Sequence, residues 1–276
     1  MDRIRLIASD MDATLLDEQS QLPADFEETI HALAELGIRF APASGRPLYT
    51  LEAMFPTLQD ELVFIGDNGG AIRWNGQNLF TSEMSPEGWR ALNRLTREQG
   101  DIAVLCGLES AYVERTFAVH DAVLRHFYTK IEYVDRLEDV AAPADKFTIY
   151  LPQHNAQQAY DTVYASQRSI YSVAVAGECW VDIMNPGVHK GAALQTLGQL
   201  WGLPSESIMA FGDTYNDAEM LRTAKYGFLM ENGSEPLRQK VPFLAPSHRE
   251  AGVMQVLHRV LAQNGCVCPE DFVPAH

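Results

Sequence analysis

The stretch Leu6-Ile7-Ala8-Ser9-Asp10-Met11-Asp12-Ala13-Thr14-Leu15-Leu16 decides how the rest of the chain is interpreted. A short apolar run that begins at Ile4 ends at two aspartates, two positions apart. Because side chains alternate along a strand, Asp10 and Asp12 would leave the strand end on the same side. In an open α/β protein, this end of a strand carries the chemistry. Two carboxylates this close repel each other unless a cation or a shared proton separates them. A bare Asp-x-Asp is more often a solvated turn, so other residues must decide its role.

The composition predicts one large α/β domain or two domains with separate cores. The chain has 276 residues, of which 46% are apolar, and this is enough for a sizeable packed core. Acidic residues outnumber basic ones by 37 to 21, for a formal net charge of −16. Nucleic acid and anionic membranes reward clustered Lys and Arg, so we expect neither as a partner. No run approaches the roughly 18 apolar residues of a membrane span.

The four cysteines and the N-terminus favour a cytoplasmic protein. Cys106 and Cys179 stand alone, and Cys266 and Cys268 lie too close together for an ordinary disulfide. They also lack a second cysteine pair for zinc, so we expect reduced, structural cysteines. The N-terminus enters a strand almost at once, which leaves no room for a signal peptide. The sequence does not indicate an oligomeric state.

The first third of the chain alternates strands with helices. After the opening strand we expect a helix over 23–36, a strand over 38–43 and a third, buried strand over 62–65. A hairpin closed by Asn75-Gly76 follows. This order is typical of a doubly wound, Rossmann-like parallel sheet with its functional loops at the strand ends.

From about residue 82 the pattern changes to hairpins mixed with helices. We expect two helices and five strands here: helices over 86–99 and 156–167, and strands over 102–106, 111–113, 146–151, 169–176 and 179–184. This mixture predicts a small α+β unit with a mostly antiparallel sheet. Because doubly wound signals resume after it, we expect a core over 1–82 and 187–276, with an inserted unit over 83–186.

The last third of the chain returns to alternating strands and helices. We expect a helix opened by Lys190-Gly191, strands over 207–211 and 226–230, and a final helix over 250–261. We expect the tail after Asn264 to be loose.

Four strand ends carry chemically reactive side chains: Asp10 and Asp12; Ser44; Lys190; and Asp213 with Asn216 and Asp217. The ends of parallel strands share one edge of the sheet, so these side chains can converge. Carboxylate and amide oxygens suit Mg²⁺, which also takes waters and a substrate phosphate. A hydroxyl, a lysine and backbone N–H groups in Ser44-Gly45-Arg46-Pro47 suit a phosphoryl group. One aspartate can then attack phosphorus while a second moves protons. Serine or cysteine hydrolysis fits poorly, because no histidine stands beside a serine at a strand end.

These residues resemble the four motifs of the haloacid dehalogenase superfamily of phosphatases, in the family's order. The matching segments are Asp10-Met11-Asp12-Ala13-Thr14, Ser44-Gly45-Arg46, Lys190-Gly191 and Gly212-Asp213-Thr214-Tyr215-Asn216-Asp217. The long insert between the second and third motifs resembles the cap of the Cof-like sugar-phosphatase branch. Asp67-Asn68-Gly69-Gly70 and Pro186-Gly187-Val188-His189-Lys190-Gly191 also match that branch. The resemblance covers essentially the whole chain, although the cap matches in layout more than in residues.

The resemblance implies a catalytic role for each matching position. Asp10 would be the nucleophile and a metal ligand. Asp12 would be the general acid and base, and would lend its backbone carbonyl to Mg²⁺. Ser44, Gly45 and Lys190 would hold the phosphoryl oxygens, with Lys190 also screening Asp10.

The third set of matching residues would complete a Mg²⁺ site. Asp213 would bind the metal, Asp217 would lie beside it directly or through water, and Asn216 would support the site. The resemblance therefore implies a Mg²⁺-dependent phosphatase that hydrolyses a small phosphorylated metabolite, most of all a sugar phosphate, through an aspartyl phosphate.

Ala13 departs from the family, which usually has glycine at this position. If the backbone there needs a positive φ, alanine is strained by about 1 kcal/mol or more. All chemical groups remain, and the retained Asp12 favours ester hydrolysis over dehalogenation. Two alternatives stay open: a phosphomutase of the same superfamily, and a non-catalytic sugar-phosphate-binding protein.

Other polar and aromatic residues have both a functional and a structural interpretation. Arg46 can contact substrate or phosphate, or can pair with a surface acid. Asn68 can line the site or simply shape its Gly-rich turn. We expect Lys146 to be structural, and three further cap residues to serve surface or core packing: His120, His126 and Trp180.

Overall fold

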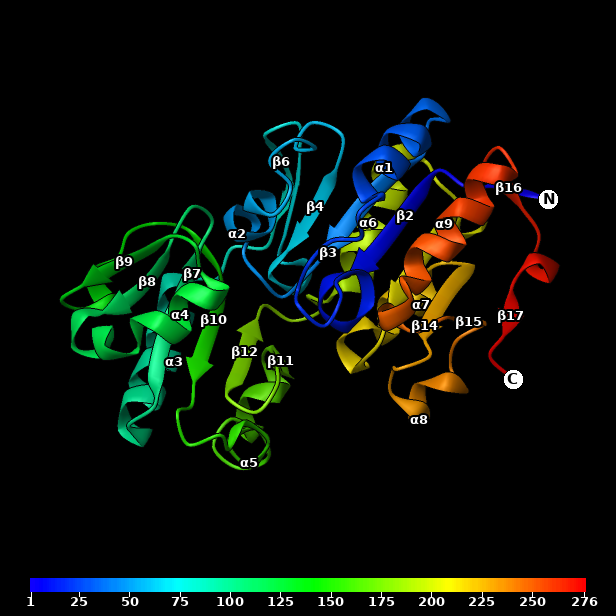
Figure 1. Ribbon diagram of the computed structural model, residues 1–276. Coiled ribbons are helices and arrows are strands. Elements are labelled where there is room, and N and C mark those ends of the chain that lie inside the picture. The colour runs from blue at the N-terminus through cyan, green and yellow to red at the C-terminus, as the bar shows by residue number, and fades with distance from the viewer.

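The computed structural model describes residues 1–276 and contains two large sheets (Figure 1). A nine-stranded sheet draws its strands from both ends of the chain, and a six-stranded sheet uses only residues between 102 and 184. Figure 1 shows the six-stranded sheet with its helices, in green, as a separate lobe beside the larger one. We refer to these lobes as the core and the cap.

The core sheet has a parallel centre and antiparallel margins. Its strands, in spatial order, are β17 (Val273–Pro274), β15 (Phe243–Ala245), β14 (Tyr226–Met230), β13 (Ile208–Gly212), β2 (Leu6–Asp10), β3 (Arg39–Ala43), β4 (Val63–Gly66), β5 (Ala71–Trp74) and β6 (Gln77–Thr81). The strands from β15 to β4 run parallel, whereas β17, β5 and β6 pair antiparallel. The chain order reverses at β2, which is where open α/β sheets place their ligand crevice.

Helices cover both faces of the core sheet, as a doubly wound fold requires. One face packs against α1 (Phe26–Glu35), α2 (Leu48–Ala53) and α9 (Gly252–Ala262). The other packs against α6 (Lys190–Trp201), α7 (Ala218–Thr223) and α8 (Glu235–Arg238). Because side chains alternate along β2, Ile7 enters the first cluster while Leu6 and Ala8 enter the second. The α/β, doubly wound fold class is confirmed.

The cap sheet is almost entirely antiparallel. Its spatial order is β11 (Ser172–Val175), β12 (Trp180–Met184), β10 (Ala144–Tyr150), β7 (Ile102–Gly107), β8 (Ala111–Glu114) and β9 (Ile131–Val134). Only β8 and β9 pair parallel. Two helices, α3 (Pro86–Gln99) and α5 (Ala156–Asp161), pack on one face, and α4 (Asp121–Phe127) packs on the other.

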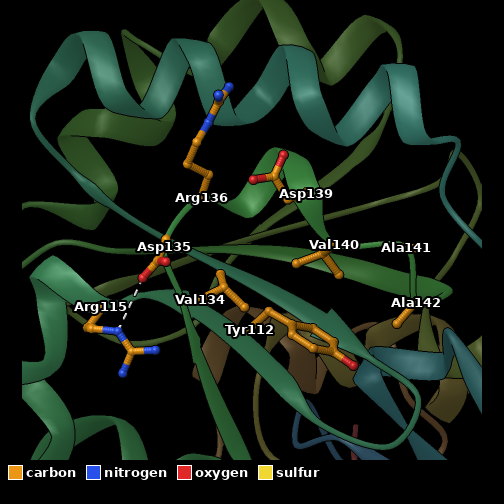
Figure 2. Close-up of a pocket in the computed structure, with 9 residues that line it drawn as sticks. All are labelled: Tyr112, Arg115, Val134, Asp135, Arg136, Asp139, Val140, Ala141 and Ala142. Atoms are coloured by element: carbon orange, nitrogen blue, oxygen red, sulfur yellow. Dashed lines mark hydrogen bonds and ion pairs between the residues drawn. The ribbon is translucent and has the colours of Figure 1, made fainter.

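The cap also carries a surface hollow of its own, of about 440 Å³ (Figure 2). Arg115 pairs there with Asp135 at 3.3 Å, while Arg136 and Asp139 point away from that pair. Its charged groups do not converge on one point, and none follows a core strand. This hollow therefore has none of the features of a reaction site.

Two sequence-based predictions of local structure were wrong. The helix expected over 156–167 ends at Asp161, because Tyr164 turns into the cap interior, where it is fully buried. The tail after Asn264 is not loose. Its segment β16 (Cys266–Val267) pairs with β1 (Asp2–Arg3), and β17 pairs with β15.

An aromatic side chain explains why the tail is ordered. Phe272 is only 8% exposed and packs edge-on against Phe228, with ring centroids 5.0 Å apart. Burying a phenylalanine side chain stabilises the fold by about 2 kcal/mol. Because its sequence neighbours are polar, the hydrophobic pattern of the tail does not reveal this burial.

Candidate active site

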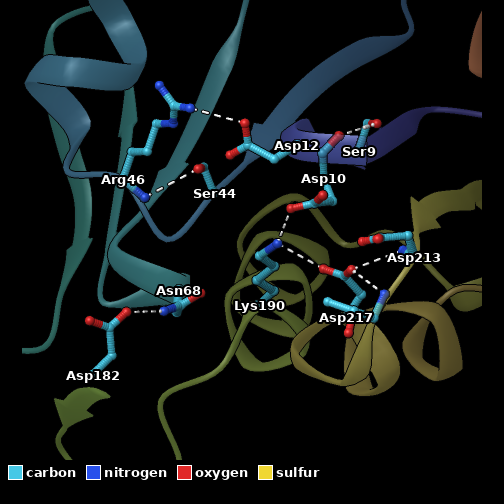
Figure 3. Close-up of polar contacts among 11 residues, drawn as sticks. Ser9, Asp10, Asp12, Ser44, Arg46, Asn68, Asp182, Lys190, Asp213 and Asp217 are labelled. Carbon is cyan, nitrogen blue, oxygen red and sulfur yellow. Dashed lines mark hydrogen bonds and ion pairs between the residues drawn. The ribbon is translucent and has the colours of Figure 1, made fainter. Parts of the chain in front are cut away.

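A buried lysine joins two of the predicted strand-end acids (Figure 3). Asp10 is the last residue of β2, and Lys190 is the first residue of α6. The Lys190 ammonium donates to Asp10 Oδ1, and to Asp217 Oδ1 at 2.7 Å. Lys190 and Asp217 are fully buried and Asp10 is 7% exposed. The ends of β2 and α6 and the loop after β13 therefore meet at one point, as the sequence predicts.

Burial sets the protonation of this cluster. Burial raises the pKa of Asp10, and the Lys190 ammonium only partly offsets the rise. Burial also works against the charge on Lys190, but Asp10 and Asp217 outweigh it, so the pKa of Lys190 stays above its usual value. Burial, together with the charge of Asp217, raises the pKa of Asp213 to about 7. The cluster therefore holds more carboxylates than its single lysine can neutralise.

Backbone groups fix Asp217 in place. Its Oδ2 accepts hydrogen bonds from the backbone N–H groups of Asp213, at 3.0 Å, and Thr214, at 3.2 Å. Gly212 packs directly against the Asp217 side chain and leaves no space for a Cβ. This close approach explains why glycine precedes Asp213 in the motif.

The acidic cluster fits a hard divalent cation. Asp10, Asp213 and Asp217 each offer a carboxylate oxygen, and these atoms lie within 4.8 Å of one another. Asn216 adds an amide oxygen that is buried without a hydrogen-bond partner. An all-oxygen donor set of this kind suits Mg²⁺.

Asp12 is held apart from the acidic cluster. Its side chain is 56% exposed, and its Oδ1 accepts from Arg46 Nη2 at 2.9 Å. Arg46 pairs with an exposed acid, but that acid is Asp12, and both residues line the same hollow, so its interpretation as a substrate contact stays open. The chain turns sharply after Asp12, with Ala13 at φ +60°. The condition for strain at Ala13 is therefore met.

The loop after β3 forms the opposite side of the site. The Ser44 hydroxyl accepts from the backbone N–H of Arg46 at 3.1 Å, and the Ser44 carbonyl accepts from the backbone N–H of Asn68. Ser44 is not a helix cap, because α2 begins only at Leu48. A Cβ on Gly45 would lie 3.2 Å from the Asn68 amide, so glycine lets the two loops approach.

These residues line one hollow of about 530 Å³ between core and cap, which we call the central hollow. Its core side includes Asp10, Asp12, Ser44, Gly45, Arg46, Asn68, Asp213 and Asn216. Its cap side includes Phe127, Tyr128, Lys146, Thr148, Trp180 and Asp182. Lys190 and Asp217 lie directly beneath it, in contact with Asp10.

Two charged cap residues line this hollow although the sequence analysis did not place them there. Lys146 was expected to be structural, and Asp182 was not singled out at all. Asp182 Oδ2 accepts from Asn68 Nδ2 at 2.9 Å, which draws Asn68 into the site (Figure 3). The available signal was a polar residue at each of two positions inside apolar cap strands. His120 and His126 do not line the hollow.

A family model described as haloacid dehalogenase-like hydrolase matches residues 7–257. The chain belongs to this family. Among the curated relatives, the 5-amino-6-(5-phospho-D-ribitylamino)uracil phosphatase of Escherichia coli is 32% identical, with 94% of this chain and 96% of that protein covered. The HMP-PP phosphatase of Cronobacter sakazakii is 31% identical over 87% of this chain and 89% of that one.

The solved structures of this family share the fold. SMU.1108c of Streptococcus mutans superposes with a TM-score of 0.85 at 28% identity, covering 94% of this chain and 99% of that chain. A HAD/COF-like hydrolase from Plasmodium vivax reaches the same TM-score at 18% identity, covering 95% and 97% of the two chains. The protein is a phosphatase of the Cof-like branch, a hydrolase of the phosphate monoesters of small metabolites. None of its helices combines the length and the hydrophobicity that a membrane crossing requires.

Proposed function

We propose that this haloacid dehalogenase-like phosphatase is Mg²⁺-dependent and acts on sugar phosphates or related sugar-alcohol phosphates through an aspartyl phosphate on Asp10. One observation carries the proposal. The buried Lys190 bridges Asp10 and Asp217 beneath a hollow that Asp12 and Ser44 also line.

Asp10, Asp213 and Asp217 would hold the metal, since their oxygens approach one another within 4.8 Å. The Asp12 backbone carbonyl would be a further ligand. Bound Mg²⁺ would neutralise these carboxylates and the phosphoryl oxygens at once.

The chain's own residues account for both halves of the reaction. An Asp10 carboxylate oxygen attacks phosphorus, the bond from phosphorus to the ester oxygen breaks, and Asp12 gives its proton to the leaving oxygen. Water then attacks the aspartyl phosphate, Asp12 takes the proton from that water, and the bond from phosphorus to the Asp10 oxygen breaks. Lys190, the Ser44 hydroxyl and the Gly45 N–H would hold the phosphoryl oxygens as charge develops.

Residues 83–186 would act as a cap on the site, with the core formed by 1–82 and 187–276. The cap residues that line the central hollow come from β10, β12, the end of α4 and the loops at His154 and 176–179. A cap in this place excludes bulk water while the acyl phosphate exists.

The names of two relatives guide the choice of substrates. The Escherichia coli enzyme is named for a phosphoribityl compound, and the Cronobacter sakazakii enzyme for HMP-PP. We propose phosphorylated sugars and sugar alcohols, with 5-amino-6-(5-phospho-D-ribitylamino)uracil among them, as the first compounds to assay.

The decisive experiment replaces the nucleophile. Asp10→Asn should lower the turnover of p-nitrophenyl phosphate with Mg²⁺ by at least about 1,000-fold, because an amide is a poor nucleophile. The matched control is Asp60→Asn, which changes an exposed aspartate outside the central hollow and should keep full activity. Circular dichroism must show both variants folded. Appreciable turnover by folded Asp10→Asn would refute the aspartyl-phosphate mechanism.

The same assay separates hydrolysis from phosphomutase activity. Free phosphate released from a sugar monophosphate, with no bisphosphate activator present, is the result expected of a phosphatase. Transfer to another position of the same sugar without phosphate release would contradict our proposal.

A further inference from the structure

The cap sheet presents one mixed face to the central hollow. Register pairs Thr148 with Asp182 and Tyr150 with Trp180, so these four side chains share a face. The intervening residues, such as Phe147 and Val181, point to the other face and pack beneath α3 and α5. The hollow-facing side is polar near the core and aromatic farther out.

The aromatic part begins next to the catalytic acid. The Arg46 guanidinium, which pairs with Asp12, lies 5.9 Å from the Phe127 ring centroid. The Phe127 ring is 5.0 Å from the Trp180 ring, and Trp180 is 4.6 Å from Tyr150. Phe127 and Trp180 both line the hollow. A continuous aromatic wall therefore runs from the edge of the reaction site into the cap.

The polar part offers an unused hydrogen-bond acceptor. Asn68 is 95% buried, and its Nδ2 donates to Asp182, so the amide orientation is fixed. The other carboxylate oxygen of Asp182 accepts from the Thr148 hydroxyl at 2.7 Å. Asn68 Oδ1 has no partner, although it is buried at the lining of the hollow. Burying an unpaired amide oxygen is costly, which makes it a built acceptor for a ligand N–H or O–H.

The cation on the cap side of the hollow is already paired. Lys146 donates to the Gly45 carbonyl at 2.5 Å and forms ion pairs with Asp67, at 3.1 Å, and Asp182, at 3.6 Å. It leaves no free charge for a second phosphate. The cap wall therefore suits a neutral group with a flat face and hydrogen-bond donors at its edge.

We propose that the central hollow binds phosphate esters whose organic part carries a flat, nitrogen-containing ring, stacked on Trp180 and Phe127, with a donor group of the ligand bound to Asn68 Oδ1. The inference rests on the proposed phosphatase function and narrows its substrate class. A ring of this kind gains from stacking on an aromatic face, whereas a ringless sugar phosphate leaves that face unused.

Pairs of esters that differ only by a ring test the proposal. The first pair is ribose 5-phosphate and uridine 5′-phosphate, and the second is ribitol 5-phosphate and riboflavin 5′-phosphate. With Mg²⁺ present, kcat/KM should be about tenfold higher for the ring-bearing member of at least one pair. Trp180→Ala should reduce this ratio to about one, because only the ring-bearing ester gains from the wall.

Matched variants guard against a folding defect. Trp74→Ala removes a tryptophan of the core that packs on Trp201 and does not line the hollow, so it should keep the ratio. Trp180→Phe retains an aromatic ring and should keep most of the difference in kcat/KM, which tests the inference even if Trp180→Ala unfolds. Equal kcat/KM within both pairs, or a ratio unchanged in folded Trp180→Ala, would overturn the inference. Failure to hydrolyse every ester, p-nitrophenyl phosphate included, would instead overturn the proposed function on which it rests.

Discussion

Two lysines are buried at the centre of the molecule, one in the core and one in the cap, and each lies between two aspartates. Lys190 contacts Asp10 and Asp217, and Lys146 contacts Asp67 and Asp182. Both side chains are at most 2% exposed. Their local chemistry looks alike, yet their surroundings differ.

The core lysine lies beside carboxylates that converge on one point, whereas the acids around the cap lysine do not converge. Asp213 adds a third carboxylate around Lys190, within reach of the other two. Around Lys146, Asp182 also accepts from Asn68 and Thr148. Asp145 adds a third buried acid near Lys146, but the acids there do not converge as Asp10, Asp213 and Asp217 do. Converging carboxylates suit a divalent cation. We therefore expect the first cluster to serve the reaction and the second to support the Gly45 loop.

The largest expected effect comes from removing the core lysine. Lys190→Met should lower kcat for p-nitrophenyl phosphate by about 1,000-fold, because the phosphoryl charge loses its cation. Lys240→Met, at an exposed lysine, should change kcat little. If folded Lys190→Met retained a tenth of wild-type activity, the distinction between the two lysines would fail.

Removing the cap lysine should weaken the fold more than the chemistry. Lys146→Met leaves Asp67 and Asp182 buried without their cation, which should lower the free energy of unfolding by about 3 kcal/mol. Urea denaturation measures this loss, with the exposed Lys130→Met as control. We expect kcat to fall by no more than about tenfold, since Asp10, Asp12 and Lys190 are untouched. A kcat loss as large as that of Lys190→Met would show that Lys146 belongs to the reaction site.

The excess negative charge of the core cluster predicts two pH dependences. The stability of the metal-free protein should fall as the pH rises, and the stabilisation by bound metal should grow. Burial and Asp217 raise the pKa of Asp213 from 3.8 to about 7. Between these values the folded, metal-free protein holds a proton that the unfolded chain has lost. Its unfolding free energy should therefore fall as the pH rises from 4 to 7.

Thermal unfolding tests this linkage. Asp213→Asn should flatten the pH dependence of Tm for the metal-free protein. Because Mg²⁺ binds the deprotonated carboxylates, it should raise Tm by a few degrees more at pH 8 than at pH 5.5. A metal-free Tm that climbs more steeply from pH 5 to 7 in wild type than in Asp213→Asn would contradict the assignment.

The smallest effect concerns the turn that follows Asp12. Ala13→Gly should raise the free energy of unfolding by about 0.5 kcal/mol, because relief of the strain at φ +60° exceeds the entropy cost of glycine. Ala32→Gly, inside α1, should lower it by about 1 kcal/mol. Destabilisation by Ala13→Gly would show that the alanine methyl group packs better than its backbone angle suggests.

The core part of the site follows from the sequence because each residue stands just after a strand. Asp10, Ser44 and Asp213 need only the rule that parallel strand ends share an edge. Four motifs in order then turn a weak Asp-x-Asp signal into an expected nucleophile and an expected general acid. For Ala13 the sequence predicts strain if φ is positive, and the structure supplies the angle of +60°.

The cap wall was not predictable in this way. Lys146 and Asp182 are 36 positions apart, and only the register of β10 against β12 brings their side chains to the same face. A one-residue slip between the two strands would place them on opposite faces. The place of Trp180 was equally hard to predict, because a tryptophan buried in a core and one that lines a hollow give the same sequence pattern. The ordered tail escaped prediction because Phe272 finds its aromatic partners far away in the chain.

That tail has a consequence for how molecules of this protein meet one another. The parallel sheet would otherwise end at β15, with a row of unpaired donors and acceptors that another chain can extend. The strand β17 covers this row, and Pro274 within it has no N–H to offer to a further strand. Two residues near the C-terminus thus protect the concentrated enzyme from edge-to-edge aggregation.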